Sequence, residues 1–339
     1  MNNLRNKFFK TVIGAVALAA SVAGLSSCDA INEDLAPCPE GVSLRFVFDY
    51  NMEFANAFPS QVDCLTLLVY DADGNYITTR TETTQVLADE NWRMVIDLPA
   101  GKTYHFVAYG GLECPKSTFG FVNTPAAGST LQQLQVSMDA DCIGADPGKE
   151  LHPLFYGDLD MTVPAGALDY TAGTVYMMRD TNTLRILLQN VDGTPCNPDD
   201  FVFTVTDNNT LFNYDNSVIA TPQGITYAPY VTGQAGAGST EEGNDAVLAY
   251  AEFSLSRLME HSGARLVITN KENGDAVLSI PLVNYLLLLR NQQFADMGNQ
   301  EFLDREHRWN MILFLEHGRW IDTNIVINDW IVRINHAEL

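Results

Sequence analysis

Residues 41–50 read Gly-Val-Ser-Leu-Arg-Phe-Val-Phe-Asp-Tyr, with apolar side chains at every second position from Val42 to Tyr50. This period of two is typical of a β-strand with one face buried in a core. Similar patterns follow in four further segments, at residues 62–70, 92–98, 103–109 and 154–163. Turn-forming residues lie between them, for example Asp71 to Asn75 and Pro99 to Gly101. This half of the chain is therefore predicted to be built of strands.

Strand patterns continue in the second half of the chain. They cover residues 174–189, 201–206, 246–255, 265–269, 276–283, 308–315, 320–327 and 330–334. Helical signal is scarce: residues 286–290 could end a strand or begin a short helix, and residues 299–307 could form another. Asn273-Gly274 predicts a hairpin, and the Gly-rich, acidic segment 233–244 predicts a mobile loop. Many short strands separated by turns predict an all-β fold of two β-sandwiches with a few short helices.

The first 40 residues have the pattern of an export signal and a tether. Arg5, Lys7 and Lys10 precede an apolar run, which ends at Leu25-Ser26-Ser27-Cys28. This pattern predicts a lipoprotein signal peptide over residues 1–27, with cleavage before Cys28 and acylation of its sulfur. An ordinary secretory signal, in which Cys28 is incidental, is the alternative. Residues 28–40 are short and acidic, contain Pro37 and Pro39, and are predicted to be a tether between the lipid and the first sandwich.

The length of the chain and a Pro- and Gly-containing break in the strand pattern suggest the domain organisation. The chain has 339 residues, more than one small core usually organises, so two domains are expected. Pro164-Ala165-Gly166 interrupts the strand pattern. We therefore predict an N-terminal β-sandwich domain over residues 41–167 and a C-terminal one over residues 168–339.

Charge and cysteine content limit the partners and the crosslinks. The formal net charge is −23, and such a field repels nucleic acid and anionic lipid surfaces. Five cysteines remain when Cys28 carries lipid, and their connectivity cannot be read from spacing. An oxidising export route would allow Cys38–Cys64 or Cys114–Cys142 to pair. Buried free thiols are an equally good interpretation.

The motifs do not indicate catalysis, a cofactor or a metal. Asp71, Asp73, Asn75 and Glu82 have calcium-loop spacing, but Tyr76 stands where such loops require Gly, so a plain hairpin turn is favoured. The six histidines are scattered and predict no metal site. The sequence lacks a nucleophile elbow, a P-loop, a dinucleotide fingerprint and a zinc-protease helix. We therefore expect a non-enzyme, although two carboxylates from distant strands could still meet, as in a glycosidase.

Several segments together resemble the FimB-type fimbrial anchor lipoproteins of Bacteroidales, which belong to type V pili. The resemblance rests on the signal ending at Cys28, the tether ending at Cys38-Pro39, and residues 41–52, 62–71, 280–288, 300–305 and 325–330. It implies two tandem transthyretin-like β-sandwich domains. It also implies a structural protein at the base of a pilus, lipid-anchored in the outer membrane, exposed at the cell surface and attached to a fimbrial shaft subunit.

In fimbrillins of this type, the resemblance implies assembly by donor-strand exchange, in which a strand of one subunit completes a groove in the next. Shaft subunits are trimmed by a trypsin-like protease, whereas an anchor is expected to keep its N-terminus. Arg45 lies inside a predicted strand and is therefore a poor cleavage site. The candidate donor strand is the last one, Trp330, Ile331, Val332, Arg333 and Ile334, which could leave its sheet without breaking a loop. Permanent pairing within its own domain is the alternative.

A second function stays open on the sequence alone. The chain could be a surface lipoprotein that binds glycan or host protein, as an adhesin or as an accessory or tip fimbrillin. Exposed aromatic side chains such as Trp92, Trp320 and Tyr230, aligned in a shallow cleft, would favour that function.

Overall fold

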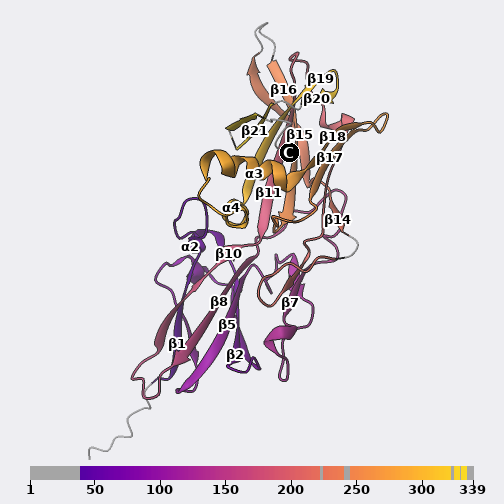
Figure 1. Ribbon diagram of the computed structural model, residues 1–339. Helices are drawn as coiled ribbons and strands as arrows, with labels where there is room; N and C mark the ends of the chain where they lie inside the picture. The colour runs from indigo at the N-terminus through magenta and orange to yellow at the C-terminus, as the bar shows by residue number, and fades with distance from the viewer. Residues whose placement is uncertain (1–38, 222–223, 240–244, 322–323, 329, 334–339) are drawn as a thin grey trace, which may run out of the picture. The chain divides into compact units, whose positions relative to one another are not determined.

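The computed structural model describes residues 39–221, 224–239, 245–321, 324–328 and 330–333. Within these ranges the strands form five sheets, and the helices α2 (Phe58–Gln61), α3 (Leu282–Gln293) and α4 (Asn299–Arg305) are short (Figure 1). The all-β fold with a few short helices is confirmed. None of the helices in this part of the chain has the length and hydropathy needed to cross a membrane.

The first sandwich packs a three-stranded sheet against a five-stranded one. The smaller sheet has the order β4 (Met94–Asp97), β1 (Gly41–Val47), β9 (Thr171–Tyr176). The larger has the order β10 (Met178–Arg179), β8 (Phe155–Val163), β5 (Lys102–Gly110), β2 (Leu65–Asp71), β3 (Tyr76–Glu82). Val42, Leu44 and Phe46 of β1 are all buried in the core between these sheets. The period of two in β1 is thus the pattern of its buried face.

A small third sheet joins the two halves of the sequence. It has the order β13 (Leu211–Asn213), β7 (Gln135–Met138), β6 (Phe119–Phe121). Val136 and Phe212 of this sheet share a second core with Leu68 of β2 and Val107 of β5. Strands β2 and β5 therefore contribute to a core on both faces, which explains the unbroken apolar runs at residues 67–70 of β2 and 106–109 of β5.

The second sandwich also packs two sheets. One has the order β15 (Val231–Ser239), β16 (Asp245–Ser256), β11 (Thr181–Asn190), β19 (Arg308–Glu316), β21 (Asn324–Ile327), β22 (Trp330–Arg333), with β20 (Arg319–Trp320) also paired to β19. The other has the order β14 (Ile225–Tyr227), β12 (Phe201–Asp207), β17 (Arg265–Asn270), β18 (Ala276–Pro281). The predicted Asn273-Gly274 turn joins β17 to β18, and Gly274 has the positive φ of 75° that this turn requires.

The segment from residue 233 corrects the sequence prediction. Residues 233–239 do not form a loop but belong to β15, an edge strand paired with β16. A Cβ atom at Gly233 would lie 2.6 Å from the Tyr250 hydroxyl oxygen. Glycine here permits close approach of a neighbouring side chain, so its presence does not indicate mobility. Residues 240–244 of the predicted loop lie outside the described ranges.

The predicted long strand over residues 174–189 is also divided. Its first part belongs to β9 and β10, which pair with β1 and β8, and its second part is β11 of the next sandwich. The strands that follow residue 168 therefore first complete the sheets of the N-terminal sandwich. The chain changes sheets at Asp180, which lies between β10 and β11.

Candidate functional site

The predicted lipidation site, Cys28, lies outside the described residues, as does the signal peptide before it. The described chain begins at Pro39 and enters β1 at Gly41. The predicted tether is therefore followed directly by a strand of the first sandwich.

Strand β1 occupies the middle of its sheet. It pairs antiparallel with β4 and parallel with β9, so its backbone is hydrogen-bonded on both sides. A Cβ atom at Gly41 would lie 2.0 Å from the carbonyl oxygen of Ile96, so only glycine fits where the strand begins. Arg45 is paired opposite Thr174 of β9. The chain's own first strand thus fills the space between β4 and β9.

The candidate donor strand is β22, and the structure pairs it with β21 at the edge of the large sheet of the second sandwich. Among the described residues, the hairpin formed by β21 and β22 pairs with β19 at two positions, Met311 with Ile327 and Ile312 with Val326. Asn328, at a positive φ of 45°, donates its backbone N–H to Asn310 O at 2.8 Å, and its Oδ1 accepts from Asn310 N at 2.7 Å. This attachment is short compared with that of β11 to β19. Ile334, the last residue of the candidate strand, lies outside the described residues.

A buried ionic network lies where the chain passes from the first sandwich to the second. The Arg257 guanidinium donates from Nε and Nη2 to the two carboxylate oxygens of Asp304 on α4, each at 2.8 Å. Its Nη1 donates to the carbonyl oxygen of Asn216 at 2.7 Å, and Asn216 Nδ2 donates to Asp180 Oδ1 at 2.9 Å. Asp180 is completely buried, and its other oxygen, Oδ2, has no hydrogen-bond partner among the described residues.

An aromatic contact extends this junction to the segment after β1. The Arg305 guanidinium of α4 lies over the Tyr50 ring at 4.1 Å and over the Phe54 ring at 4.8 Å from their centroids. Such cation–π contacts contribute about 0.5–2 kcal/mol each, depending on desolvation. Together with Arg257, they connect the end of β1, the crossing at Asp180 and helix α4. We name Tyr50, Asp180, Asn216, Arg257, Asp304 and Arg305 the junction network.

Burial shifts the pKa values of two side chains in this region, Asp180 and His307. Desolvation raises the pKa of Asp180 to about 7, although the Arg257 cation and the Asn216 amide oppose the rise. Desolvation, together with the Arg179 and Arg308 cations, lowers the pKa of the nearby His307 to about 4. The two shifts have opposite consequences for stability. Ionisation of Asp180 destabilises the fold as pH rises from about 4 to 7, whereas deprotonation of His307 stabilises it as pH rises from about 4 to 6.5.

Replacing Asp180 with asparagine should therefore alter the pH dependence of stability. The asparagine side chain cannot ionise, so the loss of stability between about pH 4 and 7 disappears while the opposite contribution of His307 remains. We expect the gain in unfolding free energy from pH 5 to pH 7.5 to be larger in Asp180→Asn than in the wild type, by about 1–3 kcal/mol. Urea unfolding at both pH values measures this difference. Parallel pH profiles of the two proteins would show that Asp180 is already ionised at pH 5.

The observed disulfide differs from the pairings suggested by the sequence. Cys64 is joined to Cys114, so neither Cys38–Cys64 nor Cys114–Cys142 forms. Cys142 and Cys196 are free and buried, and Cys38 lies outside the described residues. The pairing follows from the fold, because residue 64 precedes β2 while residue 114 follows β5, and β2 and β5 are antiparallel neighbours.

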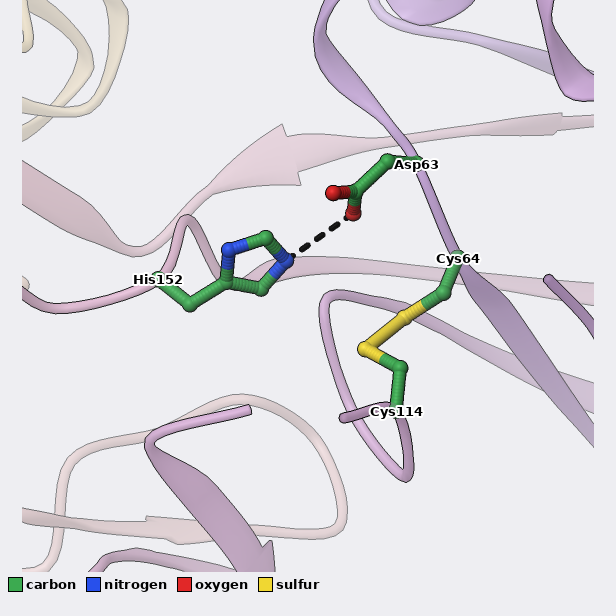
Figure 2. Close-up of side chains that lie close together, drawn as sticks. All are labelled: Asp63, Cys64, Cys114 and His152. Carbon is green, nitrogen blue, oxygen red and sulfur yellow. Dashed lines mark hydrogen bonds and ion pairs between the residues drawn. A yellow bond between two sulfur atoms is a disulfide. The ribbon is translucent and has the colours of Figure 1, made fainter. Parts of the chain in front are cut away.

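Two side chains that the sequence did not single out lie beside this disulfide (Figure 2). His152 Nε2 lies 2.9 Å from Asp63 Oδ1, and both residues line a cavity of about 730 Å³ together with Cys64 and Cys114. Lys116 Nζ lies 3.9 Å from the other oxygen of Asp63. No sequence signal could have found this cluster, because Asp63 and His152 are 89 positions apart.

The suggested calcium loop is a hairpin turn. Asp71 Oδ1 accepts hydrogen bonds from the backbone N–H groups of Asp73 and Asn75 at 2.9 and 2.8 Å. Glu82, the twelfth position, lies at the far end of β3, in an extended strand that begins at Tyr76. A carboxylate at the end of such a strand cannot return to the turn to complete a coordination sphere.

The aromatic residues suggested for glycan binding do not form one platform. Trp92 packs on Phe46 in the first sandwich, whereas Trp320 packs on Tyr285 in the second. The Tyr230 hydroxyl donates to a carboxylate oxygen of Glu252 at 3.0 Å. The three side chains therefore belong to separate local contacts.

Comparison with known proteins places the chain among fimbrial proteins. The minor fimbrium anchoring subunit Mfa2 of Porphyromonas gingivalis is 22% identical over 341 residues, which cover 97% of each chain. A crystal structure of a candidate adhesin from Bacteroides thetaiotaomicron is 51% identical, with a TM-score of 0.84, and covers 89% of this chain and 100% of that one. The solved structure of the P. gingivalis fimbrial anchor protein Mfa2 has a TM-score of 0.66 at 17% identity over 88% of this chain and 100% of that one, and so shows the shared fold.

The family model of the fimbrillin-A associated anchor proteins Mfa1 and Mfa2 matches residues 35–336, which include both sandwiches and the terminal hairpin. The predicted resemblance to fimbrial anchor proteins is thereby confirmed. A match of this extent assigns a fimbria-associated, cell-surface role. The chain belongs to the family of fimbrillin-A associated anchor proteins.

Proposed function

We propose that this protein is a lipid-anchored subunit that attaches a fimbria to the outer membrane and joins the shaft by donating β22. The observation that carries the proposal is the contrast between its first and last strands. β1 is paired on both sides in the middle of a sheet, whereas β22 is an edge strand on a hairpin with a short attachment.

Because of this contrast, the subunit can donate a strand at one end but cannot readily accept one at the position of β1. The space between β4 and β9 is filled by β1, so a strand from another subunit could enter there only after β1 had been removed. Removal of β1 would also withdraw Val42, Leu44 and Phe46 from the core. β22, in contrast, can exchange one backbone partner for another, because within the described part of the chain β21 is its one ladder partner. The subunit is therefore suited to donate a strand and to retain its own first strand, as expected of the base of a polymer.

A second candidate function is adhesion. It is favoured by the 51% identity to the structure described as a candidate adhesin. Trp92, Trp320 and Tyr230 offer no shared binding platform, so this function would need another surface. Binding of the purified chain to glycan or host-protein arrays, in the absence of shaft subunits, would support it.

The lipid anchor predicts a change of cell fraction. Cys28 is the only residue placed for acylation by the signal pattern, so Cys28→Ala should move nearly all of the protein from the membrane to soluble fractions. Fractionation without detergent and immunoblotting measure this change. Cys38→Ala, further along the tether, is the matched control and should remain in the membrane. Protease treatment of whole cells that carry the wild type tests whether the protein is exposed on the outer surface of the cell. A Cys28→Ala protein that stays in the membrane would contradict the proposal.

Locking β22 to β21 tests donation without removing any residue. Ile325 and Val332 are direct partners, so cysteines at both positions can form a crosslink across the hairpin. Cells that carry the oxidised double variant should lose most of their attached shafts, as should cells that carry a chain lacking residues 330–339. Shafts counted by electron microscopy measure attachment. Each single cysteine variant is a control and should attach shafts normally. Normal attachment by the locked protein, with the crosslink verified by mass spectrometry, would disprove donation of β22.

A further inference from the structure

Four metal-ligand side chains converge beside the first sandwich. One ligand atom from each of Asp63, Cys64, Cys114 and His152 lies within 4.8 Å of the others. The four residues come from three segments: the entrance to β2, the loop after β5 and the segment before β8. In Figure 2 the His152 ring and the Asp63 carboxylate point toward one another next to the disulfide.

The backbone holds these segments in place independently of the disulfide. Gly111 donates its N–H to Cys64 O at 3.0 Å. A Cβ atom at Gly111 would lie 1.9 Å from Pro153 O, so glycine brings the loop after β5 against the segment that carries His152. His152 donates its own backbone N–H to Thr118 Oγ1 at 3.0 Å. The backbone around the ligand residues is therefore held by contacts in addition to the Cys64–Cys114 bond.

We propose that Asp63, Cys64, Cys114 and His152 form a zinc site that exists only when the Cys64–Cys114 bond is reduced. Two thiolates, one imidazole and one carboxylate suit Zn²⁺, a borderline-soft ion that takes four such ligands in a tetrahedron. With bonds of about 2.3 Å to sulfur and about 2.0–2.2 Å to nitrogen and oxygen, neighbouring ligand atoms in such a site are about 3.3–3.8 Å apart. No two of the four ligand atoms are more than 4.8 Å apart, which is about 1 Å beyond these spacings, and zinc would replace the sulfur–sulfur bond and the hydrogen bond among them.

The two states are mutually exclusive because a disulfide sulfur is uncharged and a metal ligand must be a thiolate. A dithiol reductant gives two electrons and two protons to the Cys64–Cys114 bond and closes to its own disulfide. Two thiols result, and Zn²⁺ replaces their two protons, which pass to solvent. In either state the segments before β2 and after β5 remain crosslinked, by a covalent bond or by the metal. The adjoining cavity of about 730 Å³ gives the ion access from solvent.

Zinc titration of the full chain in detergent, before and after treatment with a phosphine reductant, tests this site. We expect no high-affinity zinc binding by the oxidised protein and one equivalent by the reduced protein, measured by competition with a chromophoric chelator. Co²⁺ in place of Zn²⁺ should give the absorption bands of a tetrahedral thiolate complex. Equal binding before and after reduction would overturn the proposal.

Variants identify the ligands. Cys64→Ser and Cys114→Ser should each weaken zinc binding by the reduced protein by about 100-fold or more, and His152→Gln and Asp63→Asn by about 10-fold or more. Cys38→Ala and Cys142→Ala are the matched controls and should bind as the wild type does. Binding that needs both cysteines but neither His152 nor Asp63 would overturn the four-ligand site. Circular dichroism monitors folding, and a reduced chain that unfolds and is not restored by Zn²⁺ would also overturn it.

Discussion

Arg257→Ala should lower the free energy of unfolding by about 3–5 kcal/mol, because it leaves the buried carboxylate of Asp304 without its cationic partner. The side chain of Arg257 is only 12% exposed, and it makes three hydrogen bonds to two other segments. Its loss also removes a cation whose Nε lies 3.8 Å from Asp180 Oδ1. Urea unfolding at pH 7.5, monitored by circular dichroism, measures the change.

Arg185→Ala is the matched control for this prediction. Arg185 forms an ion pair with Glu252 at 3.3 Å, but its side chain is 39% exposed, and water can solvate the carboxylate that remains. We expect a loss of about 1 kcal/mol or less in Arg185→Ala. Replacing Arg257 and Asp304 together with Met and Leu should be less harmful than Arg257→Ala, because no unpaired charge is left buried at that pair. Equal effects of Arg257→Ala and Arg185→Ala would show that the junction network does not stabilise the fold.

Loss of the Cys64–Cys114 bond should be about equally severe. The two residues are 50 positions apart, and in the loop-entropy model a crosslink of that span stabilises the folded state by about 4 kcal/mol. We expect Cys64→Ala, Cys114→Ala and the double variant to lose nearly the same stability when unfolded by urea under oxidising conditions without zinc. The second substitution adds little because the bond is already absent after the first.

Reduction of the wild type provides the control for the disulfide prediction. The reduced, zinc-free protein should unfold at about the same urea concentration as the double alanine variant. Addition of Zn²⁺ should stabilise the reduced wild type but not the variant, as a consequence of the proposed zinc site. If the double variant instead lost the sum of the unfolding free energies lost by the two single variants, the stabilisation would come from packing of the sulfur atoms and not from the crosslink.

The strands show most clearly what can be read from local sequence. β1 and β8 were predictable because alternate residues enter a core, and that alternation follows directly from strand geometry. Prediction of secondary structure failed or stayed ambiguous where the same local sequence pattern is compatible with two different structures. Gly233 looked like part of a flexible loop, but glycine also permits the close approach of Tyr250 that β15 needs. The apolar run in α3 was ambiguous, because a buried helix and a buried strand have similar composition over a few residues.

The all-β class, the acidic charge and the resemblance to fimbrial anchors were determined by the sequence by itself, because each depends on composition or on short-range pattern. The export signal stays a prediction from the same kind of pattern. Only the tertiary structure decided the Cys64–Cys114 bond, the pairing of Asp63 with His152, and the junction network around Asp180. Asn216 and Asp180 are 36 positions apart, and Arg257 and Asp304 are 47 apart. The contacts at the disulfide join residues 50 and 89 positions apart. The physical reason is that sheet order, which sets such contacts, depends on how strands pair across the whole chain and leaves no periodic signal within any one segment.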